Sequence, residues 1–131
     1  MNLTEQQKKE LIKLQQGELT GEIIYSKLAT KVKNSVDVET LQRIAKEEHQ
    51  HSEVFRSLTG VDTKGADYIG LMMGIMFSLL GPKKLFSMTA QGQYDAAKKY
   101  ESWVKQFPSL EKVITEEKQH GDTLSELSRN A

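Results

Sequence analysis

The sequence predicts an all-α protein, built as an antiparallel four-helix bundle with a long crossover between its second and third helices. Apolar residues recur at spacings of three and four, which mark one face of a helix, and no segment alternates apolar and polar residues as a strand does. The chain also contains a weak internal repeat, in which Glu18 followed by Tyr25 corresponds to Gln93 followed by Tyr100. We therefore expect two similar helical hairpins related by an approximate two-fold axis.

The first two helices are expected in the N-terminal half. The first runs from about Thr4 to Lys33, with Thr4 as its N-cap and Gln7 completing a capping box. The second runs from about Asp37 to the residue before Gly60. The polar residues 61–65 then form a linker.

The third and fourth helices fill the C-terminal half. The third covers about residues 66–105 and is interrupted at Gly81-Pro82, because proline cannot donate a hydrogen bond to the preceding turn. The fourth begins at Pro108-Ser109, a favourable helix opening, and runs nearly to the C-terminus.

Length and composition exclude several classes of protein. The 131 residues are enough for one domain with a core, which we place at residues 1–131. The chain has no cysteine, which excludes disulfides, zinc fingers, iron–sulfur clusters and rubredoxin-type iron centres. Basic and acidic residues number 18 each, and no predicted helix has a basic face, which argues against a nucleic-acid partner. The polar N-terminus has no apolar signal region, so a cytoplasmic protein is expected.

Residues 68–80 form the most apolar segment of the chain, YIGLMMGIMFSLL. These 13 residues fall short of the roughly 20 that a bilayer-spanning helix needs, which argues against a transmembrane role. We expect a helix that is buried or forms a dimer, in which flexible methionines adapt to their neighbours. Contact with a membrane surface is the alternative.

The predicted core faces of the second and fourth helices each contain a Glu and a His three residues apart. The inward positions are Leu41, Ile44, Glu48, His51, Phe55 and Leu58 in the second, and Leu110, Val113, Glu117, His120, Leu124 and Leu127 in the fourth. Residues three apart differ by about 60° around a helix and about 4.5 Å along it, so such a pair can converge on one metal ion. Burying these groups without partners would cost several kcal/mol each, and a shared metal site is the simplest reason for two such pairs. A polar network in the core is the alternative.

The first helix supplies a further carboxylate. Glu18 is the one acidic residue on its inward face, which reads Leu11, Leu14, Glu18, Gly21, Tyr25, Leu28 and Val32. Tyr25 lies two turns further on the same side and can hydrogen-bond a ligating carboxylate. Gly17 and Gly21 are unfavourable within a helix, and close approach of a neighbouring helix or a metal ligand would explain them.

The third helix has Gln93 where the first has Glu18. Its inward face reads Phe86, Thr89, Gln93, Ala96, Tyr100 and Trp103, so Tyr100 corresponds to Tyr25. Four carboxylates would neutralise two divalent ions, but the core supplies only three. The fourth negative charge must come from hydroxide, another small anion or Glu22. Otherwise the ion nearest His120 binds weakly or not at all.

With these residues, the chain resembles the rubrerythrin branch of the ferritin-like superfamily, and most closely the rubrerythrin-like domains found fused to vacuolar-iron-transporter-type membrane domains. The likeness covers nearly the whole chain and rests on four segments: GELTGEIIYSKLA, LQRIAKEEHQHSEVF, LFSMTAQGQYDAAKKY and FPSLEKVITEEKQH. It implies a ferritin-like bundle that binds two irons. The ligands it implies are Glu18, Glu48, His51, Glu117 and His120, with Gln93, Glu22, Tyr25 and Tyr100 as possible ligands or neighbours.

The resemblance also implies a function. Such proteins reduce hydrogen peroxide or oxygen as peroxidases or ferroxidases, often with electrons from a rubredoxin-like donor, and a homodimer is expected. The sequence departs from the family pattern at two positions. Gln93 replaces the family's glutamate, and Ala96 stands where an additional acid would be. A non-enzymatic domain that binds or senses iron through a single ion is therefore the second hypothesis, and a purely structural bundle is the third. Manganese suits the same set of oxygen and imidazole ligands.

Overall fold

The computed structural model describes residues 3–131, and all regular structure in this range is helical. This confirms the all-α prediction. The elements are α1 (Glu5–Ala29), α2 (Ser35–Thr59), α3 (Asp67–Leu80), α4 (Pro82–Tyr100), the short 3₁₀ helix η1 (Glu101–Trp103) and α5 (Leu110–Asn130).

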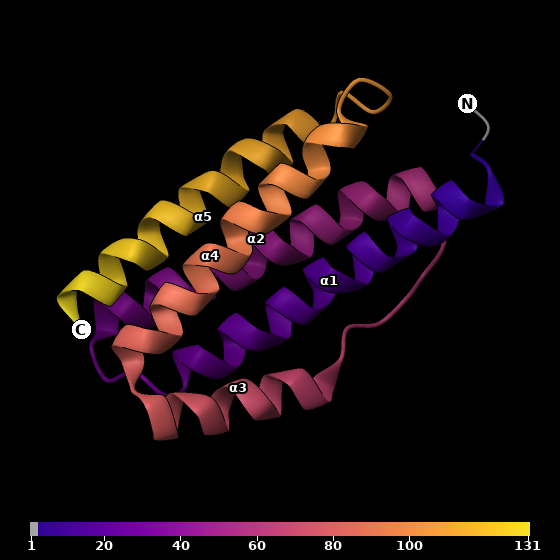
Figure 1. Cartoon of the computed structure of the whole chain (residues 1–131). Coiled ribbons are helices and arrows are strands. Elements are labelled where there is room, and N and C mark those ends of the chain that lie inside the picture. The colour runs from indigo at the N-terminus through magenta and orange to yellow at the C-terminus, as the bar shows by residue number, and fades with distance from the viewer. Residues whose placement is uncertain (1–2) are drawn as a thin grey trace. The chain divides into compact units, whose positions relative to one another are not determined.

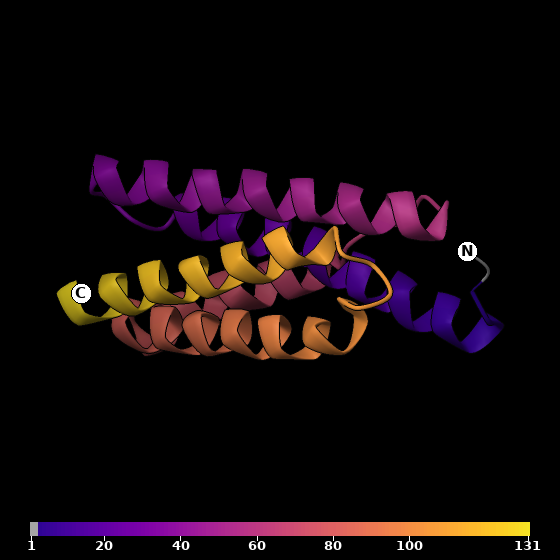
Figure 2. The same cartoon turned by 90° about the horizontal axis from the view of Figure 1, so that it is seen from above.

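The chain divides into two compact units, Met1–Gly74 and Ile75–Ala131. The first is built on the hairpin of α1 and α2, and the second on the hairpin of α4 and α5 (Figure 1 and Figure 2). In each hairpin the two helices lie side by side and run in opposite directions. The boundary between the units falls within α3, whose first half belongs to the first unit.

Local sequence signals set the ends of the helices in the first unit. Thr4 caps α1 through its side chain, and Gln7 completes the capping box, as predicted. Asn34 caps α2 by accepting hydrogen bonds from the backbone of Val36 and Asp37. Gly60 ends α2 in the left-handed region at φ 69°, which is open to glycine at little cost.

Two helices are shorter than the sequence pattern predicts. The first ends at Ala29 rather than near Lys33, because Asn34 is already the cap of the next helix. The third region is interrupted at Gly81-Pro82 as predicted, with Gly81 at φ 88°, but α4 ends at Tyr100 and not near 105. Beyond Tyr100 the chain tightens into the 3₁₀ helix η1, a conformation common at the end of an α-helix.

Each hairpin has an apolar core that follows the predicted faces. In the first unit, the fully buried side chains include Leu11, Leu28, Leu41, Ile44 and Phe55. In the second unit they include Leu85, Leu110 and Leu124. The match is incomplete: Ala97 is buried and its neighbour Ala96 is only part-buried, and several other predicted inward positions are also only part-buried, namely Leu14, Val32, Leu58, Trp103 and Leu127.

The first half of α3 packs against α1 through glycines and runs in the same direction (Figure 1). A Cβ added to Gly70 would lie 2.4 Å from Cγ2 of Ile23, and one added to Gly74 would lie 3.2 Å from Cγ of Lys27. The glycines therefore let the backbone of α3 approach α1 closely. Within residues 3–131, no helix is both long enough and apolar enough to span a bilayer.

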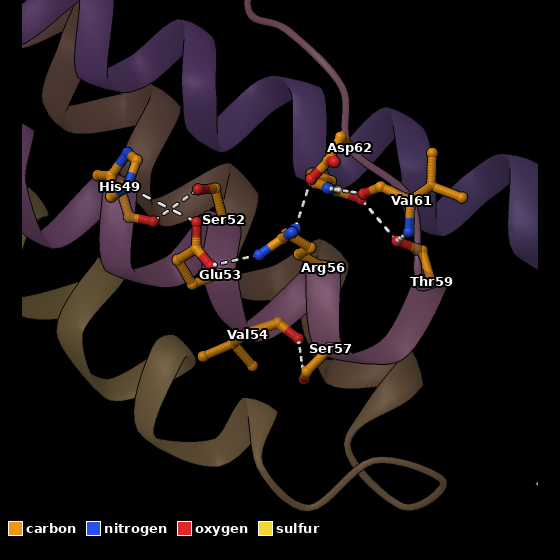
Figure 3. Close-up of polar contacts among 10 residues, drawn as sticks. His49, Ser52, Glu53, Val54, Arg56, Ser57, Thr59, Val61 and Asp62 are labelled. Atoms are coloured by element: carbon orange, nitrogen blue, oxygen red, sulfur yellow. Dashed lines mark hydrogen bonds and ion pairs between the residues drawn. The ribbon is translucent and has the colours of Figure 1, made fainter.

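A buried polar network that the sequence pattern did not predict fixes the end of α2 to α1. The Thr59 hydroxyl donates to the side-chain oxygen of Gln15 at 2.8 Å, and the Gln15 amide nitrogen donates to the Val61 carbonyl at 2.7 Å. Figure 3 shows Thr59 and Val61 in contact, and Arg56 reaching Asp62 across the turn at 2.5 Å. These bonds set where the 61–66 linker leaves the hairpin.

Candidate metal centre

The first hairpin brings two carboxylates and an imidazole together in its interior. Glu18 comes from α1, and Glu48 and His51 come from successive turns of α2. None of the three is more than 3% exposed, and one ligand atom of each lies within 4.8 Å of the others. We call this group the N-terminal half-site. It confirms the prediction that these three side chains face the core.

The distances within the N-terminal half-site are close to the spacing of ligands around a cation. Nδ1 of His51 lies 3.4 Å from Oε2 of Glu18 and 3.7 Å from Oε1 of Glu48. Both distances exceed those of ordinary N–H···O hydrogen bonds. Ligand atoms that share an ion at about 2.1 Å lie roughly 3.0–3.5 Å apart. Two buried carboxylates beside one imidazole are also a donor set that suits iron, manganese or zinc and is costly to bury by itself.

Gly21 makes room for the carboxylate of Glu48. A Cβ added to Gly21 would lie 2.3 Å from Oε2 of Glu48, so any other residue at position 21 would displace that oxygen. This confirms the predicted close approach of a candidate ligand. The same expectation is wrong for Gly17, which has no atom within 4 Å of its added Cβ.

The second hairpin contains a matching group, which we call the C-terminal half-site. Gln93 comes from α4, Glu117 and His120 come from α5, and all three are buried. Nδ1 of His120 lies 3.6 Å from Oε1 of Glu117 and 3.2 Å from Oε1 of Gln93. An amide oxygen only accepts hydrogen bonds, so this contact requires a proton on Nδ1.

The two half-sites repeat one arrangement. In each, Nδ1 of a histidine faces the Glu three residues earlier on its own helix and one side chain of the preceding helix in its hairpin. That side chain is Glu18 in the first hairpin and Gln93 in the second. The predicted internal repeat is thus present in the side-chain geometry, and Gln93 occupies the place of a carboxylate.

The other predicted neighbours lie in different surroundings. Tyr25 and Tyr100 are buried in their hairpins, as core residues two turns beyond Glu18 and Gln93. Glu22 instead lies at the surface, where its Oε1 is 3.0 Å from Nδ1 of His49. Nε2 of the same ring lies 3.6 Å from Glu53. His49 and Glu53 are exposed, as expected for residues off the inward face.

Tyr94 and Asp122 form a short contact beside the C-terminal half-site that the sequence did not indicate. The Tyr94 hydroxyl donates to Oδ1 of Asp122 at 2.5 Å. The hydrogen bond to this carboxylate, followed by desolvation, raises the pKa of Tyr94. A Cβ added to Gly121 would lie 2.5 Å from the tyrosine ring, so Gly121 creates the space for it. The sequence feature that could have indicated this contact is Gly121, a glycine inside a helix directly after His120.

The chain matches no protein-family model, no curated protein and no solved structure.

Proposed function

We propose that the N-terminal and C-terminal half-sites bind metal, as in ferritin-like proteins of the rubrerythrin type. In this proposal Glu18, Glu48 and His51 hold one ion, and Glu117 and His120 contribute from the second hairpin. The observation that carries the proposal is the buried Glu18–Glu48–His51 group, with ligand-like spacing and a glycine that leaves room for one carboxylate.

The charges favour strong binding of a first ion over a second. Glu18, Glu48 and Glu117 bring three negative charges, which exceed the charge of one divalent ion and fall one short of two. Gln93 supplies no charge, and its contact with His120 keeps a proton on the nitrogen that faces the interior. We therefore expect a tight first ion at the N-terminal half-site and a weaker second ion near His120.

The proposed activity is reduction of hydrogen peroxide or oxygen by a rubrerythrin-type peroxidase or ferroxidase. Bound iron would supply the electrons for this reaction, and an external donor such as a rubredoxin-like protein would replace them. The contribution of the chain is to place two carboxylates and an imidazole around one position and to keep bulk water away from them. Tyr25 lies two turns from Glu18 on the same buried face, where we propose that it orients a ligating carboxylate.

A second function, binding or sensing of iron without turnover, is favoured by one observation. The Gln93 oxygen faces His120 at the place where the first hairpin has a carboxylate. If this prevents a second ion from binding, the domain holds a single ion.

Anaerobic titration of the whole chain with ferrous iron, followed by peroxide, separates these functions. About two equivalents with peroxide-driven oxidation would support the enzyme, and one equivalent without turnover would support the binding domain. Glu18→Gln should abolish tight binding and the rise in thermal stability that the metal brings. The matched control is Glu39→Gln, an exposed carboxylate, which should bind like wild type. Absence of binding by the wild-type chain would refute both functions.

A further inference from the structure

The 61–66 linker is attached to α1 as it passes from α2 to α3. It has no regular structure of its own (Figure 1). The Gln16 amide nitrogen donates to the Thr63 hydroxyl at 2.8 Å, and the Ala66 backbone N–H donates to the Thr20 hydroxyl at 3.0 Å. The linker therefore follows α1 over one helical turn and is hydrogen-bonded to it at both ends of that turn.

These attachments lie on the face of α1 opposite Glu18. At 100° per residue, Gln16 and Thr20 each lie about 160° around the helix from Glu18. The buried Glu18 side chain points into the hairpin, where its Oε2 lies 3.4 Å from Nδ1 of His51 on α2. The turn of α1 that carries Glu18 is therefore held between α2 on one side and the linker on the other.

Gly65 makes the closest contact between the linker and α1. A Cβ added to Gly65 would lie 2.7 Å from the carbonyl carbon of Leu19 and 2.7 Å from the backbone nitrogen of Thr20. These atoms form the peptide group that joins the two residues after Glu18. Helical backbone cannot move aside as the end of a flexible side chain can, so the linker comes this close only because residue 65 has no side chain.

The turn that the linker supports needs support from outside. Gly17 and Gly21 stand on either side of Glu18, and glycine is unfavourable inside a helix. Glu18 and Glu48 also belong to the same buried group, and two carboxylates repel each other before a cation binds between them. A contact on the opposite face of α1 opposes the movement of Glu18 that this repulsion favours.

We propose that Gly65 is a positioning residue of the N-terminal half-site, through which the 61–66 linker holds the Glu18 turn of α1 in place. This inference rests on the proposed metal-binding function. Because coupling between two sites is reciprocal, binding of a metal ion in turn holds the linker more tightly on α1.

Trypsin cleavage after Lys64 measures how firmly the linker is held, because Lys64 is exposed and stands directly before Gly65. Cleavage there requires the linker to open locally. In the whole wild-type chain, saturating Mn²⁺ should slow this cleavage at least about fivefold. In the metal-free chain, Gly65→Ala should speed it at least about tenfold. Rates are followed by mass spectrometry and divided by those of matching free peptides, which removes the effect of the residue after Lys64.

Co²⁺ binding separates positioning from simple destabilisation. Gly65→Ala should weaken Co²⁺ binding at least about tenfold and change its visible absorption, which reports on the ligands around the ion. The matched control is Gly60→Ala, where alanine is strained by the φ of 69° but nothing lies within 4 Å of the added Cβ. This variant should be less stable and yet bind Co²⁺ as wild type does. Thr20→Val, which removes the acceptor of the Ala66 N–H, is a milder second variant and should also weaken Co²⁺ binding.

The outcomes distinguish this inference from the proposed function. Equal Co²⁺ affinities and spectra of Gly65→Ala and Gly60→Ala would overturn the inference while the metal site stands. Equal cleavage after Lys64 in Gly65→Ala and wild type would also overturn it, as would a wild-type chain that binds Mn²⁺ without any slowing of cleavage. A wild-type chain that binds no ion refutes the proposed function, and the inference falls with it.

Discussion

Gln93 faces His120 inside the α4–α5 hairpin, with its amide oxygen 3.2 Å from Nδ1 of the ring. In the α1–α2 hairpin, a carboxylate oxygen of Glu18 lies 3.4 Å from Nδ1 of His51. The two contacts are nearly equal in length but differ in charge. This difference makes the two halves of the proposed centre unequal in their attraction for a cation.

Replacing Gln93 by Glu should make the two half-sites more alike in charge. In the metal-free protein the new buried carboxylate should lower the free energy of unfolding by at least about 1 kcal/mol. Metal should more than restore that loss, because a fourth carboxylate balances two divalent ions, and the second equivalent should bind at least about tenfold more tightly. Titration calorimetry and thermal melts with and without metal measure both effects. The control is Gln119→Glu on the exposed side of α5; equal effects of the two variants would show that position 93 is not beside the metal.

Gly21→Ala should weaken metal binding without unfolding the protein. The added methyl group would meet Oε2 of Glu48 at 2.3 Å and turn that carboxylate away. We expect a loss of about 10- to 100-fold in affinity, as for other changes that misplace a ligand. Gly17→Ala is the control, because nothing lies within 4 Å of its added Cβ. It should raise stability by about 0.5–1 kcal/mol and leave metal binding unchanged. Identical metal affinities of the two variants would contradict the role of Gly21.

Gln15→Ala should destabilise the first hairpin. It removes the acceptor of the Thr59 hydroxyl and the donor to the Val61 carbonyl, both in buried or part-buried positions. Leaving these groups unsatisfied should cost about 1–3 kcal/mol of unfolding free energy, measured by chemical denaturation. Gln6→Ala, which removes only an exposed contact with Glu10, should change stability by less than about 0.5 kcal/mol. A similar small effect at position 15 would show that the network is not stabilising.

The pH dependence of stability should include a contribution from Tyr94. The hydrogen bond to Asp122 raises the pKa of Tyr94 above its ordinary value of 10.0, so the folded chain keeps this proton to higher pH than the unfolded chain. The stability from this contact is therefore fully present below about pH 10 and is lost as pH rises through the folded pKa. Subtracting the ultraviolet titration of Tyr94→Phe isolates this group. Asp122→Asn should lower its pKa, whereas Asp95→Asn should not; no difference between them would exclude Asp122 as the cause.

Much of both hairpins could be predicted from the sequence. Spacings of three and four placed Glu48, His51, Glu117 and His120 on buried faces because the helix period is independent of context, and the Thr4 capping box is a local signal of the same kind. The Gln15 network depends on contacts 44 and 46 residues apart, which no local pattern reveals. The contact of Glu22 with His49 likewise joins residues 27 apart on two helices, which no local pattern reveals. The apolar pattern of α3 did not show which of its faces is packed against α1.

Anomalous diffraction from crystals soaked with manganese or ferrous iron tests the central claim most directly. We expect an anomalous peak bonded at about 2.0–2.3 Å to carboxylate oxygens of Glu18 and Glu48 and to the imidazole of His51. Glu117 should be a ligand as well, and any second peak, near His120, should be weaker. The absence of a peak at full soaking, with these side chains hydrogen-bonded only to one another, would contradict a metal-binding role for this group.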